Sequence, residues 1–177
     1  FYVDNAKQSE FYYRKAFGFS RAAYSGLETG NRETTSYVIR QNRVNFVLTT
    51  PLNPEHPAAE HIKQHGDGVR DIAFLVEDAD LAFSEAIARG AKAFQEPHDW
   101  SDENGNVRKA AIHTYGDTIH SLISYHGSAH GKAVSSGSTA AQTASEYVYN
   151  GVFLPHFAPS EIKGKEVGIQ LIDHIVG

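Results

Sequence analysis

The sequence contains no cysteine, which excludes disulfide bridges, thiolate nucleophiles and thiolate metal ligands. A cysteine-free chain suits the reducing cytoplasm, where we expect this protein to reside. Positive charge is also scarce, with 16 Lys and Arg against 21 Asp and Glu and a net charge of −5. Because a nucleic-acid surface needs a basic patch to neutralise phosphates, we expect no nucleic-acid partner.

Long apolar runs are absent as well. None approaches the roughly 20 residues that cross a bilayer, so we expect no membrane partner. The opening residues, FYVDNAKQ, lack the basic and apolar segments of a signal peptide, and they lack an initiator Met. They begin inside a strand-like run, so we expect the chain to be part of a longer protein. With 41% hydrophobic residues, it can bury an ordinary globular core.

One pattern of elements occurs twice along the chain. In the first copy, Phe1–Val3 is predicted to end a strand, and Asp4 or Asn5 to cap a helix that runs to Phe17. Gly18 supplies the left-handed residue that stops this helix. Three strand-like runs follow, namely SRAAYSG, TTSYVIRQ and VNFVLTTP.

The second copy repeats this order. Asp71–Val76 is predicted to be a strand, and Asp78 to cap an amphipathic helix that runs to Arg89. The runs KAFQEP, VRKAAIHTYG and TIHSLIS then read as three strands. Val3 superposes on Val76, which gives a period of 73 residues. The sequence therefore predicts an α+β fold of tandem βαβββ modules, at about residues 1–51 and 69–125.

The composition changes after Tyr125. From His126 to about Ser145 the residues are small, polar and rich in Gly and Ser, which predicts a mobile linker within residues 126–166. Val167–Val176 is strand-like and ends at Gly177, where each earlier copy would begin its helix. We interpret residues 167–177 as the first strand of a further module and the start of a C-terminal domain.

Histidines are the main candidates for chemistry. His174 shares a strand face with Ile172 and Val176, where it could be a half-buried structural residue or a first metal ligand. His61 and His65 are four residues apart on a short polar helix, but Glu60 precedes them, so the HExxH zinc motif is missing.

Two further histidines flank a predicted turn at residues 115–118. If Gly116 and Asp117 form a two-residue loop, His113 and His120 lie opposite each other, and a polar cross-strand pair is the favoured interpretation. No catalytic triad or carboxylate pair stands out. We therefore assign no catalytic residue and no cofactor-binding residue within this region.

Several segments, in order, resemble the front half of the 4-hydroxyphenylpyruvate dioxygenase family. They are AKQSEFYYRKAFGFSRAAYSGLETGNRETTSYVI, NFVLTTP, HGDGVRDIAF, RGAKAF, TYGDT and IDHIVG. This family belongs to the vicinal-oxygen-chelate superfamily, also called glyoxalase-like, whose unit is the βαβββ module. The resemblance implies that residues 1–125 form a noncatalytic N-terminal domain.

The resemblance also implies a metal site. Members of the family hold Fe(II) on two histidines and a glutamate, and the motif of the first histidine is matched by residues 173–177, which makes His174 the candidate metal ligand. The other two ligands would follow Gly177. The position equivalent to His174 in the second copy is Asp71, so that module is expected to lack a metal.

The implied activity is an oxidoreductase of tyrosine and phenylalanine catabolism. The enzyme would convert 4-hydroxyphenylpyruvate, a 2-oxo acid, and O2 to homogentisate and CO2, and this fragment alone would be inactive. A homo-oligomer is expected. Two alternatives stay open, namely 4-hydroxymandelate synthase, which shares the fold, iron and substrate, and a metal-free binding module of the bleomycin-resistance type.

Overall fold

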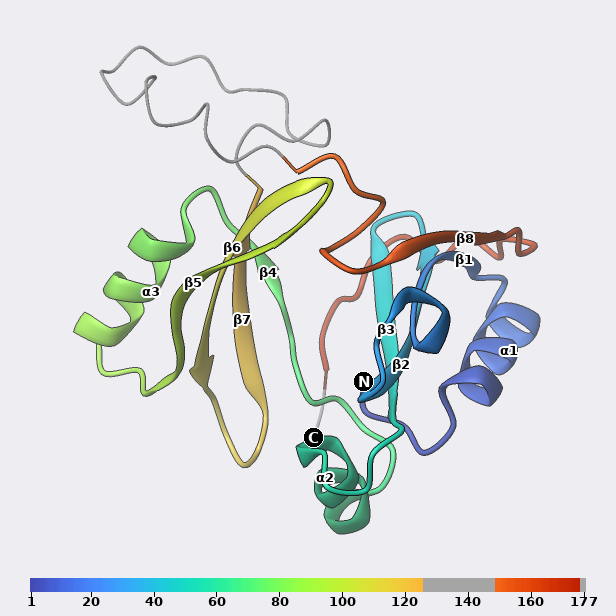
Figure 1. The fold of residues 1–177 in the computed structure, drawn as a ribbon, viewed down its shortest axis with the longest axis horizontal. Coiled ribbons are helices and arrows are strands. Elements are labelled where there is room, and N and C mark those ends of the chain that lie inside the picture. The colour runs from blue at the N-terminus through green and yellow to red at the C-terminus, as the bar shows by residue number, and fades with distance from the viewer. Residues whose placement is uncertain (126–148, 176–177) are drawn as a thin grey trace. The chain divides into compact units, whose positions relative to one another are not determined.

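The chain folds into two compact units, each built on a four-stranded sheet (Figure 1). The computed structural model describes residues 1–125 and 149–175. The first unit comprises Phe1–Gly68 and the described residues of His156–Gly177, and the second comprises the described residues of Val69–Pro155. The boundary between the two units in the sequence, after Gly68, thus falls just before the second copy of the repeat.

In the first unit, helix α1 (Ala6–Phe17) packs on a sheet with the strand order β3-β2-β1-β8 (Figure 1). Asn5 caps the helix, because its side-chain oxygen accepts a hydrogen bond from the Gln8 N–H at 3.0 Å. Gly18 ends it with a φ of 70°. The other elements are β1 (Ser20–Ser25), η1 (Leu27–Thr29), β2 (Thr34–Gln41), β3 (Val44–Pro51), α2 (Pro57–His65) and β8 (Ala158–Ile162).

The first residues of the chain add to this sheet beside β3. The Val3 N–H donates to the Thr49 carbonyl at 2.9 Å, and the Thr49 N–H donates to the Phe1 carbonyl at 3.0 Å. Tyr2 thereby forms a parallel bridge with Thr49. The predicted order of strand, helix and three strands is confirmed for the first copy. Its apolar core includes Val3, Ala6, Phe19, Ile39 and Leu48.

The second unit repeats the arrangement with the strand order β4-β7-β6-β5 (Figure 1). Asp78 caps α3 through the Leu81 N–H at 2.9 Å, and Phe83 on that helix packs against Ala110 and Leu122. The elements are β4 (Phe74–Leu75), α3 (Ala79–Ala88), β5 (Ala93–Asp102), β6 (Gly105–His113) and β7 (Ile119–Ser124). β4 pairs with β7 in parallel, as Tyr2 does with β3, so the predicted α+β fold of tandem βαβββ modules is confirmed.

The opening strand of the second copy is shorter than predicted. A regular ladder covers only Phe74–Leu75, although Asp71–Val76 was expected to be a strand. The segment still follows β7, because the N–H groups of Ile72 and Val76 donate to carbonyls of that strand. In the described part of the chain, none of the helices has the length and apolar character needed to cross a membrane.

The C-terminal part differs more from the sequence-based expectation. Residues 126–148, which hold most of the predicted linker, lie outside the described residues. Within the remainder of that predicted linker, Ala158–Ile162 forms β8 and pairs with β1. The expected strand at Val167–Val176 is wrong for its described part, which has no regular secondary structure. The N–H groups of residues 167–169 donate to the side-chain oxygen of Gln41 and not to the backbone of a neighbouring strand.

Candidate functional site

His174, the candidate metal ligand, lies in the irregular C-terminal segment of the first unit. Its side chain is 74% exposed, and its Nδ1 lies 2.8 Å from Oδ2 of Asp173. Because an ionised carboxylate can only accept a hydrogen bond, this contact places the ring proton on Nδ1. In the neutral form of this tautomer, Nε2 carries the lone pair that a metal ion would bind, an arrangement common among ligating histidines. The donor set at this position therefore fits a metal ligand.

Asp71, the residue predicted to be the counterpart of His174 in the second copy, makes two hydrogen bonds with Ser121. Its Oδ1 accepts from the Ser121 N–H at 2.9 Å, and its Oδ2 accepts from the Ser121 hydroxyl at 2.6 Å. Asp71 also forms a parallel bridge with Ile119. The carboxylate therefore ties the segment before β4 to β7, which is a structural role.

A lysine lies on the same sheet of the second unit. The ammonium of Lys109 on β6 is 5.4 Å from the ring centroid of Trp100 on β5. Burial lowers the pKa of Lys109, and the negative charge of Asp71 opposes that shift. The aromatic ring thus provides a favourable surface for a partly desolvated cation.

The predicted pairing of His113 with His120 is wrong. β6 and β7 are in a register that places His113 opposite Ile119 and His120 opposite Ile112. The Thr114 N–H donates to the Thr118 carbonyl, so three residues, not two, form the loop. This one-residue difference puts the two histidines on opposite faces of the sheet.

Each of the two histidines has its own partner. The ring of His113 lies 5.2 Å from Phe94, measured between ring centroids. His120 is 5.0 Å from Phe74 by the same measure, and its Nδ1 is 3.0 Å from the Ile72 carbonyl. Because they face opposite ways, these two histidines cannot hold one metal ion between them.

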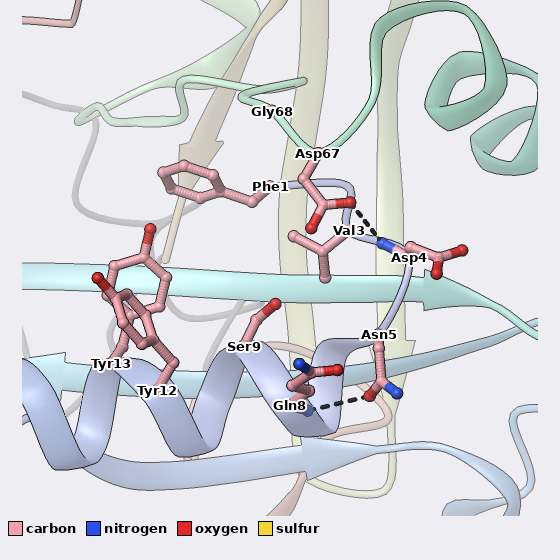
Figure 2. Close-up of a pocket in the computed structure, with 10 residues that line it drawn as sticks. All are labelled: Phe1, Val3, Asp4, Asn5, Gln8, Ser9, Tyr12, Tyr13, Asp67 and Gly68. Atoms are coloured by element: carbon pink, nitrogen blue, oxygen red, sulfur yellow. Dashed lines mark hydrogen bonds between the residues drawn. The ribbon is translucent and has the colours of Figure 1, made fainter.

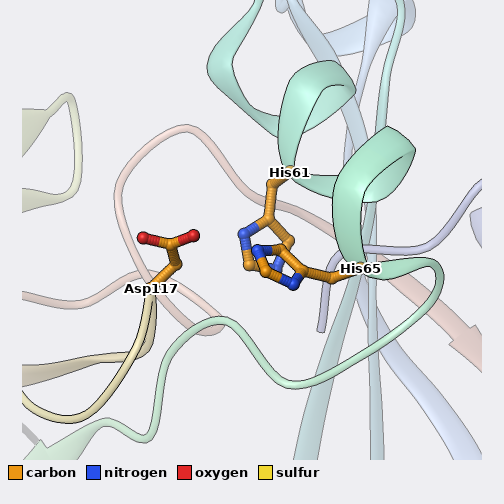
Figure 3. A group of neighbouring side chains, drawn as sticks. All are labelled: His61, His65 and Asp117. Atoms are coloured by element: carbon orange, nitrogen blue, oxygen red, sulfur yellow. The ribbon is translucent and has the colours of Figure 1, made fainter.

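His61 and His65 share one face of α2, as their spacing predicted (Figure 3). Their ring centroids are 4.7 Å apart, and the ring of His61 also meets Tyr2 edge-on at 5.4 Å. Figure 3 also draws Asp117, which belongs to the second unit. The two histidines alone supply fewer ligands than the four that zinc requires.

A pocket of about 440 Å³ opens beside the N-terminus of α1 (Figure 2). Its ten lining residues come from the start of the chain, from α1 and from the turn at residues 67–68. The Asp4 N–H donates to Oδ1 of Asp67 at 2.7 Å, which closes one side. Burial raises the pKa of Tyr13 in the lining, and the neighbouring Tyr12 and Asp67 add to that shift. The pocket has the volume of a small-molecule site, but the candidate ligand His174 is not among its lining residues.

Sequence reasoning missed Gln41 and the strand β8. Gln41 is 1% exposed at the end of β2, and it holds four backbone groups at once. A lone glutamine in a strand-like run gives no signal of such a role. The strand β8 follows a linker-like composition, which favours no strand.

Comparison with known proteins gives a consistent relationship. A family described as "Hydroxyphenylpyruvate dioxygenase, HPPD, N-terminal" matches residues 3–146. The 4-hydroxyphenylpyruvate dioxygenase of Xenopus tropicalis is 39% identical over all of this chain and 42% of its own length. That of Danio rerio is 40% identical over all of this chain and 41% of its own length. The chain thus spans less than half the length of these curated relatives.

Solved structures agree on the fold. A triple mutant of 4-hydroxymandelate synthase from Streptomyces coelicolor superposes with a TM-score of 0.65 at 30% identity, over 68% of this chain and 35% of that one. Methylmalonyl-CoA epimerase from Mycobacterium tuberculosis gives a TM-score of 0.56 at 15% identity, over 70% of this chain and 82% of that one. The second likeness shows the fold alone. With the family match over most of its length, the chain belongs to the N-terminal family of the hydroxyphenylpyruvate dioxygenases.

Proposed function

We propose that the full-length protein is a 4-hydroxyphenylpyruvate dioxygenase of tyrosine and phenylalanine catabolism. It converts 4-hydroxyphenylpyruvate and O2 to homogentisate and CO2. The observation that carries this proposal is the identity of 39–40% across the whole chain with dioxygenases of that name. Because the chain spans less than half of those relatives, the chemistry belongs to the full-length protein, and we expect the 177-residue chain alone to be inactive.

We propose that Fe(II) is the metal and that His174 is one of its protein ligands. The exposed imidazole, with Nδ1 held by Asp173 at 2.8 Å, supports this role because Nε2 is left to bind. A second histidine and a glutamate would complete the set. When bound, a metal with two histidines and one carboxylate leaves positions for a 2-oxo acid and O2, which suits oxidative decarboxylation.

Apart from His174, the residues of this chain have structural roles or orient the proposed ligand. In this proposal the two βαβββ units form a noncatalytic N-terminal domain, in which the hydrogen bond of Asp71 with Ser121 has a structural role. His174 lies in the irregular segment that follows β8, at residues 163–175. This chain then contributes one ligand, His174, to the metal site, and Asp173 orients the ring of that ligand.

The test is the substitution His174→Ala in the full-length protein. Loss of one of three protein ligands should lower Fe(II) affinity by at least about tenfold and abolish homogentisate formation. Iron content, oxygen uptake and homogentisate should be measured together. His113→Ala is the matched control, since its ring packs on Phe94, and it should keep its iron. Full iron and activity in His174→Ala would refute the ligand assignment.

The alternatives are less well supported. The likeness to 4-hydroxymandelate synthase is 30% identical, against 39–40% for the dioxygenases. Product analysis separates the two, because 4-hydroxymandelate in place of homogentisate would overturn the proposal. A metal-free binding module of the bleomycin-resistance type is disfavoured by the same family match. A cytoplasmic location and a homo-oligomer belong to the proposal and are checked by cell fractionation and light scattering.

A further inference from the structure

The end of β2 holds the C-terminal segment of the first unit through one buried amide. Oε1 of Gln41 accepts hydrogen bonds from the N–H groups of three consecutive residues, Val167, Gly168 and Ile169, at 3.1, 3.0 and 2.9 Å. On its other side, Nε2 donates to the Phe17 carbonyl at 2.7 Å. The side chain therefore links the end of α1 to residues 167–169, and only 1% of Gln41 is exposed to solvent.

The next two residues of the same hairpin turn extend this contact. Nδ2 of Asn42 donates to the Ile169 carbonyl at 2.7 Å, and the Arg43 N–H donates to the Gln170 carbonyl at 3.3 Å. The side chain of Ile169 packs on the apolar core of the unit. Three consecutive residues of the turn thus hold four consecutive residues of the segment, 167–170.

The path before these residues is fixed by close backbone contact. A Cβ at Gly18 would lie 1.9 Å from the Lys165 carbonyl oxygen, and one at Gly164 would lie 2.0 Å from the Phe19 carbonyl oxygen. The Gly164 N–H also donates to the Ser20 hydroxyl at 2.9 Å. We call residues 158–170, from β8 to Gln170, the strap. It follows the edge strand β1 and then the hairpin turn.

We propose that Gln41 is a positioning residue for the metal site, because it fixes the strap from which His174 extends. This inference rests on the proposed function. His174 follows Gln170 by four positions, with three residues between them, so the two Cα atoms can be no more than about 14 Å apart. Displacement of the strap therefore changes where His174 can present its imidazole. A residue of the first βαβββ copy then controls metal affinity without touching the metal.

Gln41→Met in the full-length protein tests this role. Methionine has a similar length and keeps the packing, but it cannot accept from three N–H groups or donate to Phe17. Amide exchange of residues 165–171, followed by mass spectrometry, should accelerate at least about tenfold. The dissociation constant for Fe(II) should rise about tenfold, measured by competition with a chelator. Gln64→Met, at an exposed position of α2, is the matched control and should change neither quantity.

Two further variants separate positioning from general loss of folding. Gln41→Glu keeps the acceptor for the three N–H groups but loses the donor to the Phe17 carbonyl, so it should recover only part of the protection and iron affinity that Gln41→Met loses. Asn42→Gly removes only the bond to Ile169, and glycine tolerates the φ of 50° there, so it should have a smaller effect in the same direction. Far-ultraviolet circular dichroism should stay unchanged in both.

The outcomes divide cleanly. If Gln41→Met has wild-type exchange rates, Gln41 does not hold the strap in place. If exchange is faster but iron affinity is unchanged, the position of the strap does not affect the metal site. If Gln41→Glu recovers neither amide protection nor iron affinity, the positioning role of Gln41 is also refuted. A wild-type protein that binds Fe(II) but forms no homogentisate would instead overturn the proposed function, because the Gln41 measurements do not depend on turnover.

Discussion

Both units tie their helix to their sheet with an arginine on a strand and a carboxylate on the helix, but in different surroundings. In the first unit, Oε1 of Glu10 on α1 accepts from Nε of Arg21 on β1 at 2.9 Å and from Nε of Arg14 at 2.5 Å. In the second unit, Arg108 on β6 lies 2.7 Å from Asp80 on α3. Glu10 is 2% exposed, whereas Asp80 is 51% exposed.

The difference shows what a buried charge requires. Glu10 needs two guanidinium partners, and Arg21 in turn has its cation over the Tyr37 ring at 4.8 Å and a hydrogen bond to Ser160 of β8. The pair of Arg108 and Asp80 needs no such enclosure, because the Asp80 carboxylate is half exposed to solvent. The hydrogen bonds that Arg108 donates to Asp80 raise the pKa of the guanidinium, and burial opposes this shift. The same topological link is therefore a core element in one unit and a surface contact in the other.

The largest expected effect is at the buried network. Glu10→Ala leaves Arg14 and Arg21 without their shared carboxylate, so the first unit should lose about 3–5 kcal/mol of unfolding free energy. Urea unfolding of the 177-residue chain measures this loss. Glu85→Ala on α3 is the control, since Glu85 pairs with Arg89 at the surface and should change stability by less than about 0.5 kcal/mol. Equal losses in the two variants would show that the burial of Glu10 has no energetic consequence.

The glycines that follow the two helices offer a second comparison. Gly18 has a φ of 70° and Gly90 a φ of 98°, so alanine is strained at both, by roughly 1–2 kcal/mol. Only Gly18 also meets the strap, where a Cβ would be 1.9 Å from the Lys165 oxygen, while nothing lies within 4 Å at Gly90. Gly18→Ala should therefore destabilise more than Gly90→Ala.

Thermal unfolding and amide exchange of residues 163–169 measure this second effect. Gly18→Ala should accelerate exchange there, and Gly90→Ala should leave it unchanged. If both variants have the same melting temperature and exchange rates, the close approach of the strap to α1 is not a constraint on residue 18.

A smaller effect is expected at the exposed pair of the second unit. Asp80→Ala should cost at most about 1 kcal/mol, because a solvated ion pair contributes little. That cost should shrink further at high salt, whereas the cost of Glu10→Ala should not. The unfolding free energies of both variants and of the wild type, measured at low and high salt, give the cost of each substitution and its salt dependence. A loss at Asp80 as large as that at Glu10 would remove the distinction between the two units.

The sequence predicted the elements that local chemistry determines. Capping preferences and the alternation of apolar residues predicted a cap at Asp4 or Asn5, a cap at Asp78, the first three strands and the repeat, and of the first two candidates the structure uses Asn5. The long-range features were not predictable in this way. β8 forms because β1 offers an edge to a distant segment, and the register of His113 and His120 depends on one extra loop residue.

The candidate site shows the same division. The motif at residues 173–177 identifies His174 through resemblance, but no local pattern shows that Asp173 contacts its ring at 2.8 Å. The role of Gln41 depends on partners 126 to 128 residues away. Contacts of such separation arise from the folded path of the chain, which hydropathy and spacing do not encode.

The smallest effect at neutral pH is expected at a tyrosine–carboxylate pair. The Tyr24 hydroxyl donates to Oε2 of Glu28 at 2.5 Å, and burial, with that hydrogen bond, raises the pKa of Tyr24 to about 12. In the second unit, the Tyr149 hydroxyl makes a longer contact of 3.4 Å with Asp102, and burial followed by the charge of Asp102 raises the pKa of Tyr149. In both units the folded protein thus favours the neutral phenol.

This sign predicts a loss of stability in alkali. A phenol whose pKa is raised on folding stabilises the folded state below its unfolded pKa of about 10, and that contribution disappears as the pH rises through about 12. The unfolding free energy of the wild type should therefore fall more steeply above about pH 10 than that of Tyr24→Phe. Denaturant unfolding at several pH values measures the two slopes, with Tyr149→Phe as the matched variant of the second unit. Identical slopes for Tyr24→Phe and the wild type would show that burial and the hydrogen bond to Glu28 do not raise the pKa of Tyr24.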